Sequence, residues 1–380
     1  MKKLTIGVFA LFFVIGLNAQ LKLPPGGGNQ KSIVTQYIGA HAHVTIKYNS
    51  PDVASPQGQS RRGQIWGQLV PYGLNSLNFG DSTPDNPSPW RAGANENTVI
   101  KFSHDMEVQG EPIAAGKYGF HLIPAEAGPW TLILTHNADA WGSYFYHPED
   151  EALRVEVNPE PAEYNEWLTF EFTDRQEEET TVALKWEDLS IPFTISLPDS
   201  KEIYVSYLRK IMSNSTGFNW AMRNQAANYC LQNDVNLEEA YQWQLATVSN
   251  TNFVGQENVN TLQTLAGLQM KLGKQDEGME TMDKAARHAT ASVFQVHQIG
   301  RQLIGIGQAD KALEIFQYNV EKNGDVWPVN VGLARGYSAV GLYEKALEHA
   351  KIAHERAPDP LNKNALAQAI ETLQQKKDIN

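Results

Sequence analysis

The stretch WRAGANENT, residues 90–98, lies in the middle of a region of short β-prone runs, and a wholly helical region follows after about residue 200. Trp90, Arg91, Asn95 and Glu96 fall together here, beside small residues and directly before an alternating apolar run. A loop in this position presents its side chains from a rigid sheet. The stretch therefore predicts a candidate site on a β domain, in a chain whose second half is helical.

Short apolar runs with a period of two flank this stretch and predict strands with one buried face. The expected strands are Ile33–Ile38, Val44–Tyr48, Thr98–Ser103, Tyr118–Ile123, Trp130–Thr135, Leu168–Phe172, Thr180–Trp186 and Ile191–Leu197. Turns are expected at 110–112 and 115–117. No helical period interrupts the runs, which favours an all-β antiparallel sandwich, with a barrel as the alternative. Residues 74–89 contain three prolines and are expected to form a long loop leading into Trp90.

The helical region carries an internal period of 34 residues. Glycines recur at that spacing, and a small residue follows each of them five positions later: Gly273, Gly307, Gly341, then Gly278, Ala312, Ala346. This pattern resembles the tetratricopeptide repeat, in which small residues stand where helices cross. We therefore expect an all-α helical solenoid over residues 201–380, with a looser copy at Ala226–Ala246 and a capping helix at Leu361–Lys376.

The first 19 residues have the features of a secretory signal. Lys2 and Lys3 precede an apolar run from Leu4 to Leu17, which is too short to span a bilayer, and cleavage is expected after Ala19. Residues 20–31 contain PPGGG and are expected to form a flexible spacer before a β domain at 32–197. The sequence thus predicts a periplasmic or secreted protein without a transmembrane segment.

Charge and cysteine content narrow the classes of function further. The formal net charge is −12, which argues against nucleic acid as a partner. Cys230 is the single cysteine and stands in a helical pattern, so a buried structural thiol is expected rather than a nucleophile. No intramolecular disulfide can form, and stability must come from packing.

Several spaced motifs in the β region belong together. They are WGQLVPYG at 66–73, WRAGANE at 90–96, AGKY at 115–118 and WGSY at 141–144. With these motifs, residues 32–197 resemble the family known as DUF2911. The resemblance implies an exported β domain of Gram-negative envelope proteins, often joined to tetratricopeptide repeats and without an established activity. The family usually passes almost directly from Pro-Tyr-Gly to Trp-Arg, so residues 74–89 are an insertion here.

Aromatic and polar residues near the central stretch are the candidates for ligand binding. Trp130, Trp167 and Trp186 lie inside strand patterns and are expected in the core. Residues at glycine-containing turns can instead hold a small molecule or glycan, with rings as platforms and polar groups that orient the ligand. The candidate ligand-binding residues are Trp90, Arg91, Asn95, Glu96 and Trp141.

Arg91 and Glu96 allow two interpretations. They form a structural network, paired with each other or with Arg154, or Arg91 binds an anion through its planar guanidinium group. Asn95 is similarly divided between holding a turn and contacting a ligand. The chemistry of the loop therefore depends on which groups meet in space.

Motifs for catalysis are missing from the sequence. It contains no nucleophile elbow, zinc-protease helix or phosphate-binding glycine loop, and His41 and His43 have no further ligands at metal-binding spacing. No catalytic residue, metal or cofactor is predicted. The favoured function is non-enzymatic ligand binding or scaffolding, in which the repeats bind a protein partner. The alternatives are an envelope or carbohydrate hydrolase that uses Glu96, and a purely structural module.

Overall fold

The computed structural model describes residues 29–249 and 255–380. The predicted signal at 1–19 and most of the predicted spacer lie outside the described residues. The chain divides into two compact units, one ending at Ser200 and the other beginning at Lys201.

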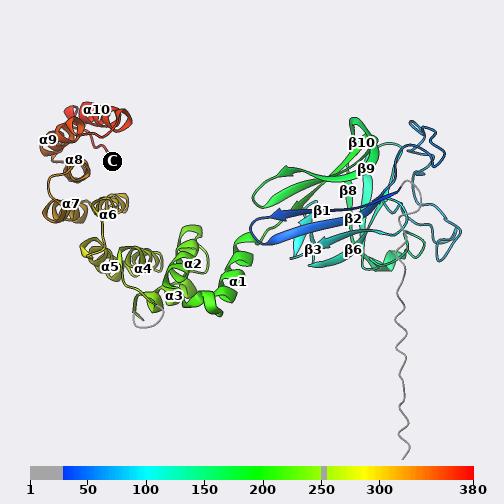
Figure 1. Cartoon of the computed structure of the whole chain (residues 1–380), viewed down its shortest axis with the longest axis horizontal. Coiled ribbons are helices and arrows are strands. Elements are labelled where there is room, and N and C mark those ends of the chain that lie inside the picture. The colour runs from blue at the N-terminus through cyan, green and yellow to red at the C-terminus, as the bar shows by residue number, and fades with distance from the viewer. Residues whose placement is uncertain (1–28, 250–254) are drawn as a thin grey trace, which may run out of the picture. The chain divides into compact units, whose positions relative to one another are not determined.

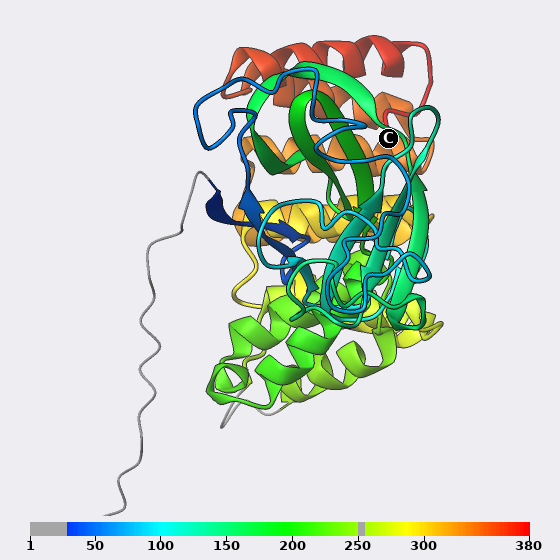
Figure 2. The ribbon, with the colours of Figure 1, turned by 90° about the vertical axis from the view of Figure 1, so that its right-hand side faces the viewer.

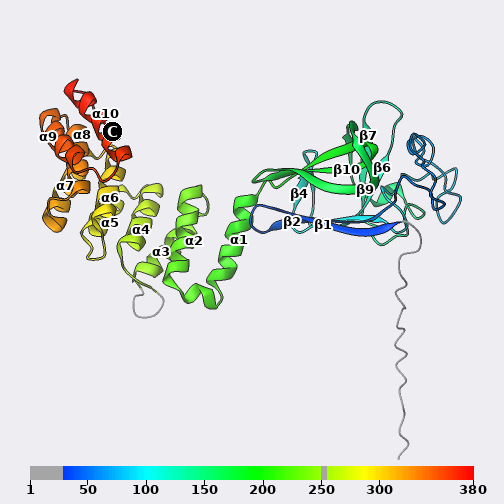
Figure 3. The same ribbon diagram turned by 45° about the horizontal axis from the view of Figure 1, so that its top comes forward.

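The first unit is built from two antiparallel sheets (Figures 1 and 3). The six-stranded sheet has the order β1 (Gln30–Ile38), β2 (Ala42–Ser50), β3 (Thr98–Phe102), β6 (Gly116–Ile123), β7 (Trp130–Thr135), β8 (Glu151–Val157). The four-stranded sheet has the order β5 (Glu111–Ile113), β4 (Met106–Val108), β10 (Glu179–Ser196), β9 (Glu160–Arg175). In Figure 3, β9 and β10 lie in one layer and β1 and β2 lie in the other.

Aromatic residues join the two sheets. The ring of Phe170 on β9 lies 5.0 Å from that of Tyr48 on β2 and 5.5 Å from that of Phe120 on β6. Phe193 on β10 also contacts Phe120, at 5.5 Å. The inward-facing residues of both layers thus form one core, and the predicted antiparallel sandwich is confirmed.

Some strands differ from the prediction. Thr180–Trp186 and Ile191–Leu197 were predicted as separate strands, but β10 runs through nearly both of them. A β-bulge at Glu187, whose φ is +54°, lets the strand continue with a changed register. The predicted turn at 110–112 was partly wrong, because Glu111 and Pro112 belong to the edge strand β5.

Short strands and one tryptophan also escaped the sequence patterns. The strands β4 and β5 are too short to show a period, and β8 was missed although its apolar and charged residues alternate. Trp167 was predicted in the core and is 39% exposed instead. It lies on β9, an edge strand of its sheet, where one face meets solvent.

The second unit is helical. Its helices are α1 (Ser200–Met212), α2 (Trp220–Asn233), α3 (Leu237–Ser249), α4 (Val259–Lys271), α5 (Gln275–Arg287), α6 (Val293–Gly305), α7 (Ala309–Asn323), α8 (Trp327–Ala339), α9 (Tyr343–Glu355) and α10 (Pro360–Gln374). They follow one another in chain order, green through red in Figure 2. A short 3-10 helix in this unit spans Ser215–Phe218, and another, Pro148–Asp150, lies in the first unit.

The glycines of the 34-residue period lie in the turn between the two helices of each pair. Gly273, Gly307 and Gly341 follow α4, α6 and α8, with φ of 79°, 78° and 78°. Glycine adopts this left-handed backbone without steric cost. Ala312 and Ala346 are fully buried at the predicted helix contacts. The helical solenoid with tetratricopeptide-like repeats is therefore confirmed, and α10 follows the last pair.

Within the described residues, no helix combines the length and apolar character needed to cross a membrane.

Candidate functional site

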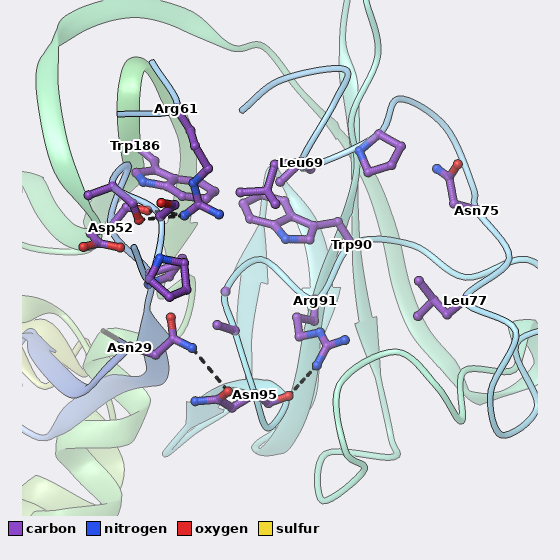
Figure 4. A pocket seen from close by; sticks show the side chains of 18 of the residues that line it. Asn29, Asp52, Arg61, Leu69, Asn75, Leu77, Trp90, Arg91, Asn95 and Trp186 are labelled. Atoms are coloured by element: carbon purple, nitrogen blue, oxygen red, sulfur yellow. Dashed lines mark hydrogen bonds between the residues drawn. The ribbon is translucent and has the colours of Figure 1, made fainter. Parts of the chain in front are cut away.

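A cavity of about 810 Å³ opens among the loops of the β unit (Figure 4). Its walls come from the segment after β2, the 69–77 segment, the 88–95 segment and β10. The lining residues that matter most are Asp52, Arg61, Leu69, Asn75, Leu77, Trp90, Arg91, Asn95 and Trp186. Segments far apart in sequence thus meet at one concave site.

Four tryptophans form a cluster behind this cavity. The Trp66 ring lies 5.6 Å from Trp90, 5.1 Å from Trp130 and 5.8 Å from Trp186, each with an edge-to-face tilt. Trp90 and Trp186 are nearly parallel, 6.2 Å apart. Trp130 and Trp186 are buried, as predicted, whereas Trp90 is half-buried and lines the cavity. The cluster gives the cavity a rigid aromatic wall.

The indole N–H groups of the cluster are not equally satisfied. Trp130 Nε1 donates to the Ala125 carbonyl at 2.9 Å. The Nε1 atoms of Trp66 and Trp186 are buried without an acceptor among the described residues. A buried donor without a partner is uncommon in folded proteins.

The bulge in β10 positions one wall. Glu187 is buried, and its carboxylate accepts a hydrogen bond from the backbone N–H of Gly63. This contact ties the loop that carries Arg61 to the strand that carries Trp186. The adjacent Arg62 points elsewhere and pairs with Asp188 at 2.9 Å.

Arg61 braces its own loop through three backbone carbonyls. Nε donates to Val53 at 3.1 Å, and Nη2 donates to Asp52 at 3.1 Å and to Ala54 at 3.0 Å. Among the described residues, no carboxylate forms an ion pair with Arg61. Within the described residues, the positive charge of Arg61 is therefore stabilised by backbone carbonyl groups and not by a carboxylate.

Arg91 is held by the motif around residue 142. Its Cζ lies 5.0 Å from the centroid of the Tyr144 ring, and Nη1 donates to the Asn95 carbonyl at 2.5 Å. Gly142 has a φ of +60°, and a Cβ there would overlap the guanidinium group. Neither an Arg91–Glu96 nor a Glu96–Arg154 ion pair, the structural alternative of the sequence analysis, is found in the described part of the chain, where Glu96 pairs with Lys31 and Arg154 with Glu151.

Glu96 takes a structural position. Its carboxylate accepts hydrogen bonds from Lys31 Nζ and Asn49 Nδ2, both at 2.7 Å. The hydrogen bond from Lys31 lowers the pKa of Glu96 most, against the opposing effect of burial. Glu96 ties β1 and β2 to the loop and does not line the cavity. Arg154 pairs with Glu151 at 2.7 Å instead.

The five predicted ligand-binding residues therefore separate. Trp90, Arg91 and Asn95 line the cavity, whereas Glu96 and Trp141 do not. Asn95 has a φ of +59°, and its side-chain oxygen accepts from Asn29 Nδ2 at 3.3 Å. Trp141 is 54% exposed outside the cavity lining.

Trp90 is aligned by the sheet rather than by the loop alone. Its backbone N–H and carbonyl pair with those of Leu122 on β6, both at 2.8 Å. After it, Ala92 adopts a φ of +50°, and Thr98 Oγ1 donates to its carbonyl at 3.0 Å. The 90–98 stretch is thus a packed turn with a defined shape, as a preformed site requires.

His121 belongs to a buried network behind the loop. Nδ1 contacts Ser143 Oγ at 3.0 Å, and Nε2 lies 3.4 Å from Thr135 Oγ1. Burial lowers the pKa of His121 to about 3, with a further contribution from Arg91. The neutral ring and the buried Ser143 are closed to solvent, so the pair has a structural role.

His41 and His43 lie two residues apart in sequence. Within residues 29–249 and 255–380, no three His, Cys, Asp or Glu side chains converge as a metal site would need. The His43 ring packs beside that of Tyr37, at 5.3 Å.

The sequence pattern missed Arg61, Leu69 and Asn75 as cavity residues. Leu69 lies inside the WGQLVPYG motif, so the motif could have indicated that this segment lines the site. Arg61 stands in a Gly- and Ser-rich loop with no local pattern. Only the folded structure shows that Arg61 and Arg91 line the same cavity.

Comparisons with known proteins found a family for the β unit and repeat proteins among the solved structures. Residues 29–195 match the family model described as "Protein of unknown function (DUF2911)", which confirms the resemblance. No curated protein matches the chain. The helical unit is similar to solved repeat proteins, all at low identity.

Three of these structures illustrate the similarity. YrrB, described as a tetratricopeptide repeat protein with an unusual peptide-binding site, is 18% identical, covering 44% of this chain and 83% of its own, with a TM-score of 0.31. A tetratricopeptide repeat protein from Parabacteroides merdae is 17% identical, covering 47% and 73%, with a TM-score of 0.32. A thermophilic one from Thermus thermophilus is 16% identical, covering 45% and 91%, with a TM-score of 0.32.

Proposed function

Since residues 29–195 form a DUF2911 domain and a helical solenoid follows them, we propose that the protein is an exported scaffold whose repeats bind a partner protein. The partner is held as an extended segment along the first helices of successive pairs. A groove lined by amide side chains carries this proposal.

The groove has a volume of about 770 Å³ and runs over α2, α4 and α6. Its polar lining consists mainly of amides: Asn224, Asn228, Gln232, Asn260, Gln263 and Gln302. Lys271 is the one charged side chain among the described residues that line it. Amides both donate and accept, so they match the N–H and C=O groups of a peptide backbone without selecting for charge.

Two of these amides are held in a fixed orientation. The Asn224 side-chain oxygen accepts from Gln244 Nε2 at 2.9 Å, and that of Asn260 accepts from Gln295 Nε2 at 2.9 Å. Because each oxygen is engaged, the Nδ2 donors remain available to the groove. A preoriented donor loses less entropy when it binds.

The chain's own final residues show how an extended segment lies on such a surface. On α8, Ser338 Oγ donates to Asp378 at 2.6 Å and accepts from the Ile379 N–H at 3.1 Å. Arg335 Nη1 reaches the Ile379 carbonyl at 3.4 Å, and Asn380 Nδ2 donates to the Arg335 carbonyl. The neighbouring helix α6 lines both this site and the groove.

Site-specific cross-linking of the full chain tests the proposal. A photoreactive residue at Gln263, in the groove, should cross-link a protein partner in the native envelope, and the same residue at the exposed Glu280 on α5 should not. The double variant Asn228→Arg/Gln263→Arg, probed from Gln302, should abolish the cross-link because bulky charge fills the groove. Equal cross-linking from Glu280, or none from the groove, contradicts it.

Export is part of the proposal and is supported by the leader sequence. The mature protein is expected to begin at Gln20 and to appear in the periplasmic or extracellular fraction. N-terminal sequencing of the fractionated protein checks this, and a cytosolic chain that keeps Met1 contradicts it.

No observation at Glu96 favours the hydrolase alternative, because its carboxylate is engaged by Lys31 and Asn49.

A further inference from the structure

The β-unit cavity has an excess of positive charge. Among its described lining residues, Arg61 and Arg91 face one carboxylate, that of Asp52, and neither arginine forms an ion pair with it. Half-buried guanidinium groups normally find a carboxylate or phosphate partner. A ligand with a negative charge can therefore supply the partner that Arg61 and Arg91 lack.

Each guanidinium group keeps donors unused. Arg91 bonds within the described protein only through Nη1, and Arg61 only through Nε and Nη2. Arg91 Nε and Nη2 and Arg61 Nη1 therefore remain for an oxyanion. The Tyr144 ring and the close approach of Gly142 fix the Arg91 group in place, so the donors are preorganised.

The rest of the cavity is apolar and aromatic. Trp90 presents part of its ring, and Leu69 and Leu77 are 46% and 38% exposed around it. Figure 4 shows Arg61 on one segment and the neighbours Trp90 and Arg91 on another, around this space. An apolar surface that shares a cavity with two cations suits a ligand with a flat apolar body and an anionic end.

The inserted loop, residues 74–89, forms part of the cavity wall. Asn75 and Ser88 pair at the base of the insertion through backbone bonds of 3.0 and 2.9 Å, and both residues line the cavity. Leu77 adds an apolar side chain from the same loop. The insertion therefore builds a wall, and the cavity of about 810 Å³ is of the size that holds a small molecule.

We propose that this cavity binds a small organic anion, with its flat apolar part against Trp90 and its carboxylate or phosphate held by the arginines of the lining, Arg61 and Arg91. The buried Trp186 Nε1 on the cavity wall is a further donor that an acceptor atom of the ligand can satisfy. This binding is independent of the groove in the repeats.

Calorimetric titration of the full mature chain with defined probes tests the proposal. Indole-3-acetate and phenyl phosphate carry a ring and an anion, indole-3-acetamide is neutral, and acetate and inorganic phosphate lack the ring. We expect the charged aromatic probes to bind at least about 10-fold more tightly than either the neutral amide or the bare anions. The ratio of indole-3-acetate to phenyl phosphate affinities identifies which anionic group fits.

Single variants locate the binding. Arg91→Gln and Arg61→Gln should each weaken the charged probes about 10-fold while leaving indole-3-acetamide unchanged. Trp90→Leu should weaken all ring-bearing probes alike. The matched control is Arg62→Gln, which removes the same charge one residue from Arg61 but outside the cavity lining, and should leave every affinity unchanged.

Three results would overturn the proposal. One is equal affinity for indole-3-acetate and indole-3-acetamide in the unmodified chain. Another is the absence of binding by every aromatic anion at millimolar concentration. The third is binding of a neutral oligosaccharide such as maltotriose in preference to the anions, which would assign the cavity to glycans. None of these results affects the cross-linking test of the repeats.

Discussion

Single residues set the shape of the β-unit site. Arg91 connects the WRAGANE and WGSY motifs, because its guanidinium group reaches the Asn95 carbonyl and packs beside Gly142 and Tyr144. The position of the Arg91 guanidinium group therefore depends on glycine at residue 142, which has no side chain, as much as on its contacts with Asn95 and Tyr144.

Gly142→Ala tests this dependence. The added Cβ meets the guanidinium group, and φ at +60° is unfavourable for alanine, so the variant should lose about 2 to 4 kcal/mol of stability. Gly128→Ala is the matched control, since φ there is +80° and nothing lies within 4 Å. It should lose only about 1 kcal/mol. Urea unfolding followed by tryptophan fluorescence measures both, and equal losses would contradict the contact with Arg91.

The buried His121 predicts a pH dependence. Its folded pKa is about 3, while an unfolded histidine has a pKa of about 6.5, so between these values only the unfolded chain gains the proton. Stability must then fall as the pH falls through this window. From pH 7 to pH 5, the native chain should lose about 2 kcal/mol more than His121→Gln, which does not titrate. Urea unfolding at both pH values checks this, and parallel losses would show that His121 is not buried as a neutral ring.

At the scale of elements, the helical unit depends on close helix contacts made by glycine. Phe316 of α7 is fully buried against Gly300 of α6 and Gly332 and Gly336 of α8. An added Cβ would lie 2.5 Å from the Phe316 ring at Gly300 and Gly332, and 2.8 Å at Gly336. The aromatic ring therefore fills space that three missing side chains leave.

Gly332→Ala should destabilise the helical unit although alanine favours helix. The steric overlap costs about 1 to 3 kcal/mol, which exceeds the helix-propensity gain of about 1 kcal/mol. Gly305→Ala, at the end of α6 with nothing within 4 Å, is the control and should be neutral or stabilising. Thermal unfolding by circular dichroism compares them. A stabilised Gly332→Ala variant would mean that the helices are less closely packed.

At the scale of the whole molecule, each unit has its own core. Leu197 is buried in the β unit, whereas Val205 and Leu208 of α1 pack in a cluster with Ala227 and Cys230 of α2. The boundary at Ser200 thus passes between two sets of buried side chains.

Fragments that end at Asp199 and begin at Ser200 should each fold. We expect thermal midpoints within about 5 °C of the corresponding transitions in the full chain, because a cut there removes no core residue. A cut after His288 is the control. It separates Met282 and Ala285 from Val296 and Ile299, which share one core, so those fragments should lose cooperative unfolding. Unfolded fragments from the first cut would show that the units stabilise each other.

Sequence alone was sufficient where a pattern repeats locally. Period-two alternation predicted strands β1, β2, β3, β6 and β7. The 34-residue spacing of Gly273, Gly307 and Gly341 predicted the helix pairs, because a left-handed turn requires glycine at each copy. The short strands β4 and β5 and the bulge at Glu187 could not be predicted, since neither creates a period.

The candidate site was only half determined by its sequence. Trp90, Arg91 and Asn95 line the cavity because one packed turn presents them together, and their binding of a ligand stays a prediction. Glu96 lies in the same turn but faces Lys31 and Asn49, and Trp141 faces solvent. Only the tertiary structure decided these directions, and only it placed Arg61 in the lining of the same cavity as Arg91. Local patterns specify backbone conformation, whereas the partner of a charged side chain is set by which distant segments fold against it.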